Sequence, residues 1–417
     1  MQVLTAIKPI HTTNRRMRVL AMELETEGHH PSYIRNFAKT WLEHEIPGDL
    51  DFLVSCKFYQ RHPDVVAYVR SLTDHGLRIH SISDAEEKKM ESNPYLRYFH
   101  GWKLFCQYAK SLNCDHGLLM YSDFFQLPML ISQRSPCPFS IIYFRPTYHY
   151  QKLSNYQPSW KEKFRAARKK WLIARVLKLP KLERVYCLDT LAIEYMKQYF
   201  KTKASIEFLP DSFAIEPVTA SRVDLLRSEL GIDKSRKIFC LVGVLDRRKG
   251  VRELLEAAMT IPESDGKRIC VLLVGKLQSD QEPEILALLK LMKQSSAIQV
   301  LLLNEFVPDT EIQKYYELSD VILTTYQKHM GASSALIRAA LAKRPVLSSD
   351  YGLMGEIVRR RQMGLTIDTT QPKEIARGIL AFLEDRPEYT LNQQYAAEMV
   401  QENSSARLAA ALRNLII

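Results

Sequence analysis

Short apolar runs alternate with amphipathic stretches along all 417 residues of the chain. Most of the runs are continuous rather than alternating, which is typical of strands covered on both faces in a parallel sheet. The runs predict strands over 17–22, 51–55, 77–82, 117–121, 139–144, 184–188 and 205–209, and then over 237–243, 268–275, 298–303, 320–324 and 345–348. This alternation of strands and helices predicts an α/β fold of two Rossmann-like, doubly wound domains facing a cleft.

The chain is too long for a single hydrophobic core and fits two domains of about 200 residues each. Two prolines and small polar residues over 208–222 separate the last strand of the first half from an amphipathic helix, as at a domain boundary. We therefore predict a first domain over 1–212, a second domain over 213–390, and C-terminal helices over 391–417.

Composition narrows the class of protein. Apolar residues make up 46% of the chain and charged residues 25%, which is ordinary for a soluble globular protein. The net charge of +11 suits anionic partners, namely nucleotide sugars, acidic lipid surfaces or nucleic acid. Seven cysteines without paired spacing predict reduced core thiols. With no long apolar run at the N-terminus, we expect a cytoplasmic protein that at most touches a membrane from that side.

One candidate site follows the strand over 237–243. Gly243 ends this strand, and Arg247, Arg248 and Lys249 then lead into the next helix. Ligands of open α/β sheets bind at this strand-to-helix position, where a cation can neutralise the charge of a diphosphate. A solvated basic turn is the alternative interpretation of the same residues.

A second candidate site opens the helix that follows 320–324. Gly331, Ala332, Ser333 and Ser334 are small, so a phosphate can approach their backbone, and a serine can cap the helix. A helix start also offers unpaired N–H donors and a dipole that favours an anion. Three further candidates for anion or nucleotide binding flank this motif: His329, Arg338 and Glu356.

At this spacing, 238–258 and 329–356 together resemble the donor-binding half of family 4 glycosyltransferases, two-domain enzymes of the GT-B fold. Lys249-Gly250 matches the family's K-G pair, and 307–325 resembles its segment near the nucleotide base. The family's E-A-M-A-x-G-x-P-V segment and its later acidic residue are matched by Ala339, Pro345, Gly352 and Glu356.

The resemblance implies a retaining, hexosyltransferase-like enzyme that moves a sugar from a nucleoside-diphosphate sugar to an acceptor, which could be a glycan, a lipid or a small molecule. It implies no cofactor and no metal ion in the chemical step. It also implies that the second domain binds the donor, that the first binds the acceptor, and that a terminal helix crosses back onto the first domain.

The chain departs from the family pattern at several positions. The paired glutamates would fall at Met330 and Arg338, the arginine of the family's G-R-L at Val244, and a usual glycine at Lys343. The second glutamate accepts hydrogen bonds from the ribose hydroxyls, and arginine has no acceptor. Ribose could be held otherwise, Arg338 could meet an additional negative group or be a solvated or ion-paired helix residue, or donor binding could be lost. The last case gives the alternative function, a non-catalytic GT-B-fold binding or scaffold subunit.

The first domain offers candidates at the ends of its strands. Gly28, His29 and His30 form a loop predicted to point into the cleft, with surface histidines as the alternative. Two neighbouring histidines without a third ligand make a poor metal site, so no metal site is predicted. Asp123 follows another strand at the cleft edge. The remaining candidates follow 139–144 and join Lys249 and Arg248 as predicted catalytic residues: Arg145, for anion or sugar contact, and His149, as a polar orienter.

From 152 to 184 the chain is rich in Lys and Arg, with Trp160, Phe164 and Trp171 interleaved. A basic helix with aromatic residues on another face could lie on an acidic membrane. The pattern favours the alternative, a solvated helix with a buried aromatic stripe. Nucleic acid is not expected as a partner, because no recognition module or aromatic platform accompanies the charge.

Overall fold

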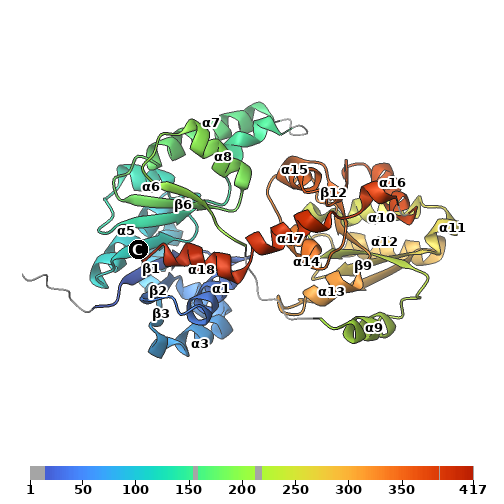
Figure 1. The fold of residues 1–417 in the computed structure, drawn as a ribbon, viewed down its shortest axis with the longest axis horizontal. Coiled ribbons are helices and arrows are strands. Elements are labelled where there is room, and N and C mark those ends of the chain that lie inside the picture. The colour runs from blue at the N-terminus through green and yellow to red at the C-terminus, as the bar shows by residue number, and fades with distance from the viewer. Residues whose placement is uncertain (1–14, 154–157, 212–217, 385, 417) are drawn as a thin grey trace, which may run out of the picture.

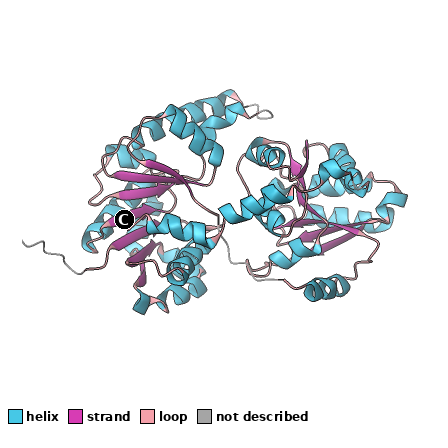
Figure 2. Ribbon diagram, viewed as in Figure 1, coloured by secondary structure: helices cyan, strands magenta, loops and turns pink. Residues whose placement is uncertain are grey.

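The computed structural model describes residues 15–153, 158–211, 218–384 and 386–416, which form two α/β lobes (Figure 1). Each lobe holds one sheet lying between helices (Figure 2). The first sheet has the strand order β3-β2-β1-β4-β5-β6-β7, and the second has the order β10-β9-β8-β11-β12-β13. Neighbouring strands pair in parallel throughout both orders. The predicted fold class is therefore confirmed.

All twelve predicted strands are present, with ends that agree within two residues. The pattern does not predict the last strand, β13, because its four residues are mostly half-buried at a sheet edge and form no long apolar run. The strands of the first sheet are β1 (Arg18–Glu23), β2 (Asp49–Val54), β3 (Leu77–Ser81), β4 (His116–Leu119), β5 (Phe139–Ile142), β6 (Leu182–Cys187) and β7 (Ser205–Phe208). Those of the second sheet are β8 (Lys237–Val242), β9 (Ile269–Val274), β10 (Gln299–Leu303), β11 (Val321–Thr324), β12 (Val346–Ser349) and β13 (Gly364–Ile367).

Helices connect the parallel strands, as parallel pairing requires. Those that precede the second sheet's lobe are α1 (His30–Glu43), α2 (Cys56–Arg61), α3 (Pro63–Arg70), η1 (Thr73–His75), α4 (Asp84–Ser92), α5 (Arg97–Ser111), α6 (Gln126–Ile131), η2 (Thr147–Lys152), α7 (Trp160–Val176) and α8 (Thr190–Tyr199). Those that follow are α9 (Ala220–Glu229), η3 (Arg247–Lys249), α10 (Val251–Met259), α11 (Glu263–Gly266), α12 (Glu282–Ser295), α13 (Gln313–Leu318), α14 (Ser334–Leu341), α15 (Gly352–Arg360), α16 (Pro372–Leu383), η4 (Pro387–Tyr389), α17 (Gln393–Glu402) and α18 (Ser405–Arg413). Across the described residues, none of these helices is long and apolar enough to cross a membrane.

Alternate residues of the central strand β1 face two different cores. Leu20 and Met22 lie in the core on one side of the sheet, and Val19 and Ala21 lie in the core on the other. Because side chains alternate along a strand, a strand buried on both faces must carry a continuous apolar run. This is the physical reason why continuous runs located the strands. The seven cysteines are free, and all but Cys56 are buried.

The helix α7 does not bury the aromatic stripe that the sequence pattern favoured. Trp160, Phe164 and Trp171 are exposed instead. The residues that α7 buries against the lobe are Ala166, Ile173 and Val176. Both sets recur at helical spacing, so periodicity alone does not tell which face of the helix meets the lobe.

The C-terminal helices connect the lobes. In Figure 1, α17 runs from the second lobe toward the first, and α18 lies against the first lobe, where it packs on α1. The Tyr186 hydroxyl of β6 donates a hydrogen bond to the Ala411 carbonyl (2.8 Å), and Arg413 Nη2 donates one to the His44 carbonyl (2.6 Å). The predicted domain boundary at 212/213 lies outside the described residues and stays a prediction.

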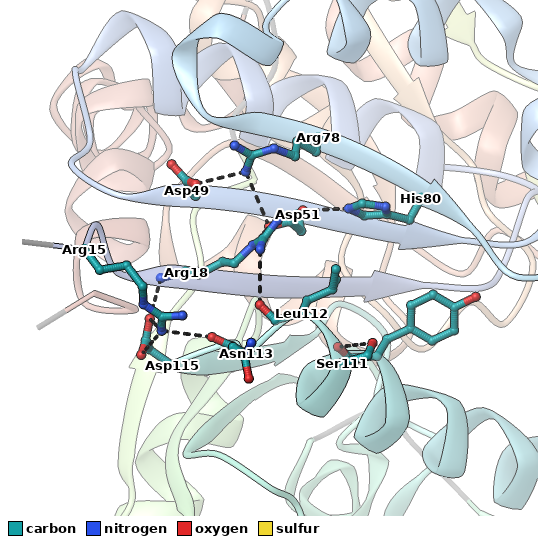
Figure 3. Close-up of polar contacts among 11 residues, drawn as sticks. Arg15, Arg18, Asp49, Asp51, Arg78, His80, Ser111, Leu112, Asn113 and Asp115 are labelled. Carbon is teal, nitrogen blue, oxygen red and sulfur yellow. Dashed lines mark hydrogen bonds and ion pairs between the residues drawn. The ribbon is translucent and has the colours of Figure 1, made fainter. Parts of the chain in front are cut away.

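A buried ion network joins three neighbouring strands near the amino ends of β1 and β2 (Figure 3). Asp51 on β2 is fully buried and accepts hydrogen bonds from Nε (2.6 Å) and Nη2 (3.1 Å) of Arg18 on β1. On its other side, His80 Nε2 on β3 lies 2.6 Å from the same carboxylate. Burial raises the pKa of Asp51, but the hydrogen bonds from His80 and Arg18 outweigh burial and hold that pKa below its ordinary value.

We expect Asp51→Ala to lower the free energy of unfolding by about 3 kcal/mol, because it removes the buried carboxylate that pairs with the half-buried Arg18 and His80. Since the pKa of Asp51 is depressed in the folded state, its contribution is present above the unfolded pKa of about 4 and is lost as the pH falls through the folded pKa. The difference between wild type and variant in urea unfolding should therefore shrink in acid. The exposed Asp74→Ala control should change stability by no more than about 0.5 kcal/mol; equal effects of the two variants would contradict the assignment.

Candidate functional site

A lysine buried at the carboxyl end of β8 forms the floor of the candidate site. Lys249 is only 5% exposed. Its Nζ donates a hydrogen bond to the Val242 carbonyl (2.8 Å) and contacts the Tyr326 hydroxyl. Gly243 has a φ of +115°, and a Cβ at this position would lie 3.0 Å from the same Nζ. The glycine that ends β8 therefore leaves the space that the ammonium group needs.

Tyr326 joins this lysine to the small-residue loop. Its ring centroid lies 4.3 Å from Lys249 Nζ and 5.4 Å from Arg248 Cζ, and its hydroxyl lies 3.2 Å from Ser333 Oγ. Burial raises the pKa of Tyr326, but the charge of Lys249, its hydrogen bond, and the charge of Arg248 outweigh burial and lower that pKa. Sequence reasoning missed Tyr326. The available signal was its place just after β11, at the carboxyl edge of the sheet.

The small-residue motif opens α14 beside this cluster. The Ser333 hydroxyl caps the helix by accepting a hydrogen bond from the Ala335 amide (3.3 Å). Ala332 and Ser334 are exposed, and Gly331 is half-buried. Because Tyr326 contacts both Lys249 and Ser333, the two predicted segments lie side by side.

His329 lies on the same side of the lobe, with its ring centroid 5.6 Å from that of Tyr326. Burial and the charge of Arg248 lower the pKa of His329 to about 4, and Lys249 and Arg145 lower it further, against one opposing hydrogen bond with the Ala332 carbonyl. The imidazole is therefore uncharged at neutral pH.

Two predicted residues of the second lobe are engaged elsewhere. Arg247 is exposed and pairs with Asp280 Oδ2 (3.3 Å). Glu356 on α15 accepts hydrogen bonds from Arg360 Nε (2.6 Å) and Arg359 Nη2 (3.0 Å) of its own helix. The structure thus brings Arg248, rather than Arg247, to the Lys249 cluster.

Arg338 adopts the ion-paired arrangement among the alternatives that the sequence leaves open. It is buried on α14, and its Nη2 donates a hydrogen bond to Asp309 Oδ1 (2.6 Å). The Asp309 side chain remains 44% exposed. A carboxylate therefore lies directly in front of position 338, although it comes from the loop after β10. Pattern reading alone did not single out Asp309, because the pair forms only in the fold.

The loop after β5 carries Arg145 at the surface of the first lobe. The backbone amides of Phe144 (2.9 Å) and Arg145 (2.8 Å) both donate to the Asp123 carboxylate. Asp123 is buried, which raises its pKa. Asp123 therefore holds the loop from beneath rather than standing at the cleft edge, which corrects its interpretation as an open cleft residue. The Arg145 side chain is exposed.

The predicted loop after β1 divides into one exposed and one buried histidine. His29 is exposed at the loop surface and stacks on His30 (4.4 Å between ring centroids) and tilts against Phe144 (4.9 Å). Although part of the residue reaches the surface, its ring packs against His30, Tyr33 and Phe144. This partial withdrawal of the ring from water, with the charges of His30 and Arg145, lowers the pKa of His29 to about 4. His30 is instead buried, with Nδ1 lying 2.7 Å from Glu23 Oε2. Gly28 is exposed at a φ of +70°.

His149 lies inside the first lobe, which corrects its interpretation as a residue at the cleft. Its Nδ1 lies 2.6 Å from the Pro146 carbonyl oxygen, and its Nε2 lies 3.0 Å from Asp189 Oδ2. Both ring nitrogens face groups of the same lobe, and the side chain is 4% exposed. His149 therefore orders the loop that presents Arg145.

The lobes contact each other next to helix α15, and an open pocket lies beside this contact. Tyr150 and Leu153 of the first lobe pack with Leu353 of α15. The pocket has a volume of about 130 Å³ and is lined by residues of both lobes. They include Asp211 after β7, Ser333 and Ser334 at the start of α14, and Asn403 after α17. Within 15–153, 158–211, 218–384 and 386–416, no three His, Cys, Asp or Glu side chains gather as a metal site would need.

Residues 223–399, most of the second lobe, match the family model "Glycosyl transferases group 1". The chain is 24% identical over 170 residues to an uncharacterized glycosyltransferase of Methanocaldococcus jannaschii, covering 41% of this chain and 42% of that one. It is 26% identical over 225 residues to a D-inositol 3-phosphate glycosyltransferase of Corynebacterium urealyticum, covering 52% and 53%. The chain thus spans about half the length of the curated relatives that it matches.

Two solved structures share the whole architecture. Anabaena HepE, in complex with UDP and glucose, superposes with a TM-score of 0.62 at 14% identity, covering 95% of this chain and 98% of that one. The sucrose-phosphate synthase of Thermosynechococcus elongatus gives 0.66 at 17% identity, covering 96% and 98%. The fold is that of GT-B glycosyltransferases. Membership of family 4 stays a prediction.

We expect His329 to titrate with a pKa of about 4 in an NMR experiment, because burial and Arg248 disfavour its charged form. Its unfolded pKa is about 6.5, so its contribution to stability is present above that pH and is lost as the pH falls toward 4. His329→Asn should therefore lose less stability than wild type over this interval. Arg248→Ala should raise the measured pKa of His329; a midpoint near 6.5 in the wild type would contradict the assignment.

Proposed function

We propose that this protein is a glycosyltransferase that moves a hexosyl group from a nucleoside-diphosphate sugar to a glycan, lipid or small-molecule acceptor, with retention of anomeric configuration. The observation that carries the proposal is the cluster of Lys249, Tyr326 and Ser333 at the start of α14. The match of 223–399 to group 1 glycosyltransferases and the GT-B fold support the same reaction class. HepE, which shares the fold, was solved with UDP and glucose.

The donor diphosphate would lie against this cluster. The Lys249 ammonium has three N–H donors, of which Val242 and Tyr326 take two, so one is left for a phosphate oxygen. The first amides of α14 supply further donors, and the helix dipole favours the anion. Arg248 adds a guanidinium group beside Tyr326. Arg145 would meet the sugar or phosphate from the opposite lobe.

Transfer would depend on charge stabilisation and positioning. The bond between the sugar and the diphosphate breaks, a glycosidic bond forms on the same face, and the acceptor hydroxyl gives its proton to the departing diphosphate. Negative charge grows on that leaving group, where Lys249 and Arg248 are already in place to stabilise it. The chemical step needs no metal ion or cofactor in this proposal, and approach of the lobes excludes water.

We further infer that Asp309 supplies the ribose acceptor that position 338 lacks. Arg338 holds the Asp309 carboxylate at 2.6 Å while leaving that side chain 44% exposed. A carboxylate has room for several hydrogen bonds, so one oxygen can bind Arg338 while others accept from ribose hydroxyls. Position 338 holds arginine where the family has glutamate. The hydrogen-bond acceptor for the ribose hydroxyls would then come from a neighbouring loop instead of being lost.

We place the protein in the cytoplasm with peripheral contact to an acidic membrane, and we propose no nucleic-acid partner. Nucleotide-sugar donors and acidic lipid headgroups are both anionic, which the net charge of +11 favours.

Lys249→Ala should lower turnover by about 10²- to 10³-fold while the protein stays folded, because a preorganised donor to the leaving group is lost. Donor hydrolysis or transfer, followed as release of the nucleoside diphosphate, measures the effect. Lys267→Ala is the matched control, because Lys267 is exposed and pairs only across one helical turn with Glu263. Full activity of the Lys249 variant would remove the phosphate assignment.

Titration with UDP and GDP should raise the melting temperature of the wild type, since a ligand that binds only the folded state stabilises it. Asp309→Asn should raise about tenfold the nucleotide concentration that gives the same increase in melting temperature, because a charged hydrogen-bond acceptor is lost. Asp280→Asn is the control, since Asp280 faces Arg247 at the surface. Absence of a shift with either nucleotide would instead favour the alternative, a non-catalytic GT-B-fold binding or scaffold subunit.

A further inference from the structure

The outer face of α7 (Trp160–Val176) presents a stripe of exposed aromatic side chains. Trp160 is 74% exposed, Phe164 is 70% exposed and Trp171 is 55% exposed. Their spacing of four and seven residues places them within about 40° of arc on a helix of 3.6 residues per turn. Large apolar side chains at such exposure mark an interaction surface when they gather on one face.

The stripe points directly away from the lobe. The buried residues of α7, Ala166, Ile173 and Val176, lie on the opposite side of the same helix. The face of α7 that packs against the lobe is therefore already occupied by these three side chains. A rotation of the helix that buried the aromatic rings would expose them. The neighbouring helix α6, which packs against α7, also exposes Leu127 (41%) and Ile131 (67%).

Basic side chains flank the stripe on both sides. The helix carries seven Lys or Arg residues and a single acid, Glu162. At 100° per residue, Lys161 and Arg168 fall on one flank, and Lys163 and Lys170 fall on the other. Glu162 does not offset this charge at the stripe, because its carboxylate accepts the Ser159 backbone amide (2.7 Å) in the helix cap.

We propose that this face of α7, the aromatic stripe with its basic flanks, docks on the surface of an anionic lipid bilayer. Tryptophan and phenylalanine rings are suited to the boundary between headgroups and acyl chains, and flanking cations bind anionic headgroups. Lys161 Nζ lies 5.6 Å from the Trp160 ring centroid, and Arg175 Cζ lies 5.1 Å from that of Trp171. The cationic groups therefore lie beside the aromatic rings, as an interfacial helix requires.

The helix α7 adjoins the loop that carries Arg145 through the face opposite the stripe. There Lys169 Nζ donates a hydrogen bond to the Arg145 carbonyl (3.0 Å), so the docking face lies one helix width from that loop. The helix α7 also packs on η2, whose Tyr150 packs with Leu353 of α15 in the second lobe. A bilayer on α7 would therefore lie near the side where the lobes meet. Resting on the proposed function, this placement assigns an amphiphilic, membrane-held acceptor whose hydroxyl enters from the bilayer surface.

Binding of the full chain to vesicles tests the docking face. We expect co-sedimentation with phosphatidylcholine vesicles that contain phosphatidylglycerol, little with phosphatidylcholine alone, and loss of binding at high salt. Of the four tryptophans, Trp41 and Trp102 are buried, so a blue shift of emission on binding reports Trp160 and Trp171. The triple variant W160S/F164S/W171S should bind at least about tenfold more weakly, because the interfacial anchors are removed.

The charged flanks have their own variant, Lys161→Glu with Lys163→Glu, which should abolish the preference for anionic vesicles. The matched control is L286S/L291S/F306S, which removes three exposed apolar side chains from the second lobe and should bind like wild type. Wild-type binding by the aromatic variant, or equal binding to neutral and anionic vesicles, would overturn the proposal. The proposal would also be overturned if the wild type binds no vesicles and forms a dimer in solution that W160S/F164S/W171S converts to monomers. That result would identify a second copy of the chain as the occupant.

The nucleotide titration separates this proposal from the proposed function. The W160S/F164S/W171S variant should keep the melting shift with UDP or GDP while it loses vesicle binding. A nucleotide shift without vesicle binding in the wild type would refute docking alone. Vesicle binding without any nucleotide shift would refute the donor site and leave docking intact.

Discussion

The buried ammonium group of Lys249 fixes the geometry of the candidate site. A charge withdrawn from water costs several kcal/mol unless it is paired or hydrogen-bonded, so Lys249 requires partners at fixed positions. Those partners are the Val242 carbonyl at the end of β8 and the Tyr326 hydroxyl just after β11. Because β8 and β11 are neighbours in the sheet, strand order sets the geometry of the site. The same tyrosine reaches Ser333, so the helix start is aligned with the lysine.

Sequence patterns predicted the fold well because strands buried on both faces must be continuously apolar. They also located Lys249 and the Gly331–Ser334 motif, which follow strands directly. They failed where a contact forms only through space. Asp309 and Arg338 are 29 residues apart along the chain, and no local pattern pairs them. The face of α7 was misjudged for a related reason, since two stripes with the same period compete for burial. The last strand escaped notice because its edge position needs few apolar residues.

The two histidines of the cleft add no positive charge near neutral pH. His29 and His329 each have a pKa lowered to about 4, so neither imidazole carries charge at pH 7. The charge of Arg145 helps to lower both pKa values, and the charge of Arg248 helps to lower that of His329, because a nearby cation disfavours protonation of an imidazole. At neutral pH an anionic ligand therefore meets these arginines without a charge contribution from the histidines. Each uncharged imidazole also has one unprotonated ring nitrogen, so hydrogen-bond acceptors are present next to these cations.

The chain passes between the lobes twice, once between β7 and α9 and once between α17 and α18. These two passages are bonded to each other, since the Asp211 amide donates to Asn403 Oδ1 (2.9 Å). The Tyr33 hydroxyl of α1 donates to the Asp211 carboxylate (2.9 Å), which anchors the junction in the first lobe. Because the two crossings are fastened to each other at this one point, any relative movement of the lobes that separates the crossings has to break the hydrogen bond between Asp211 and Asn403.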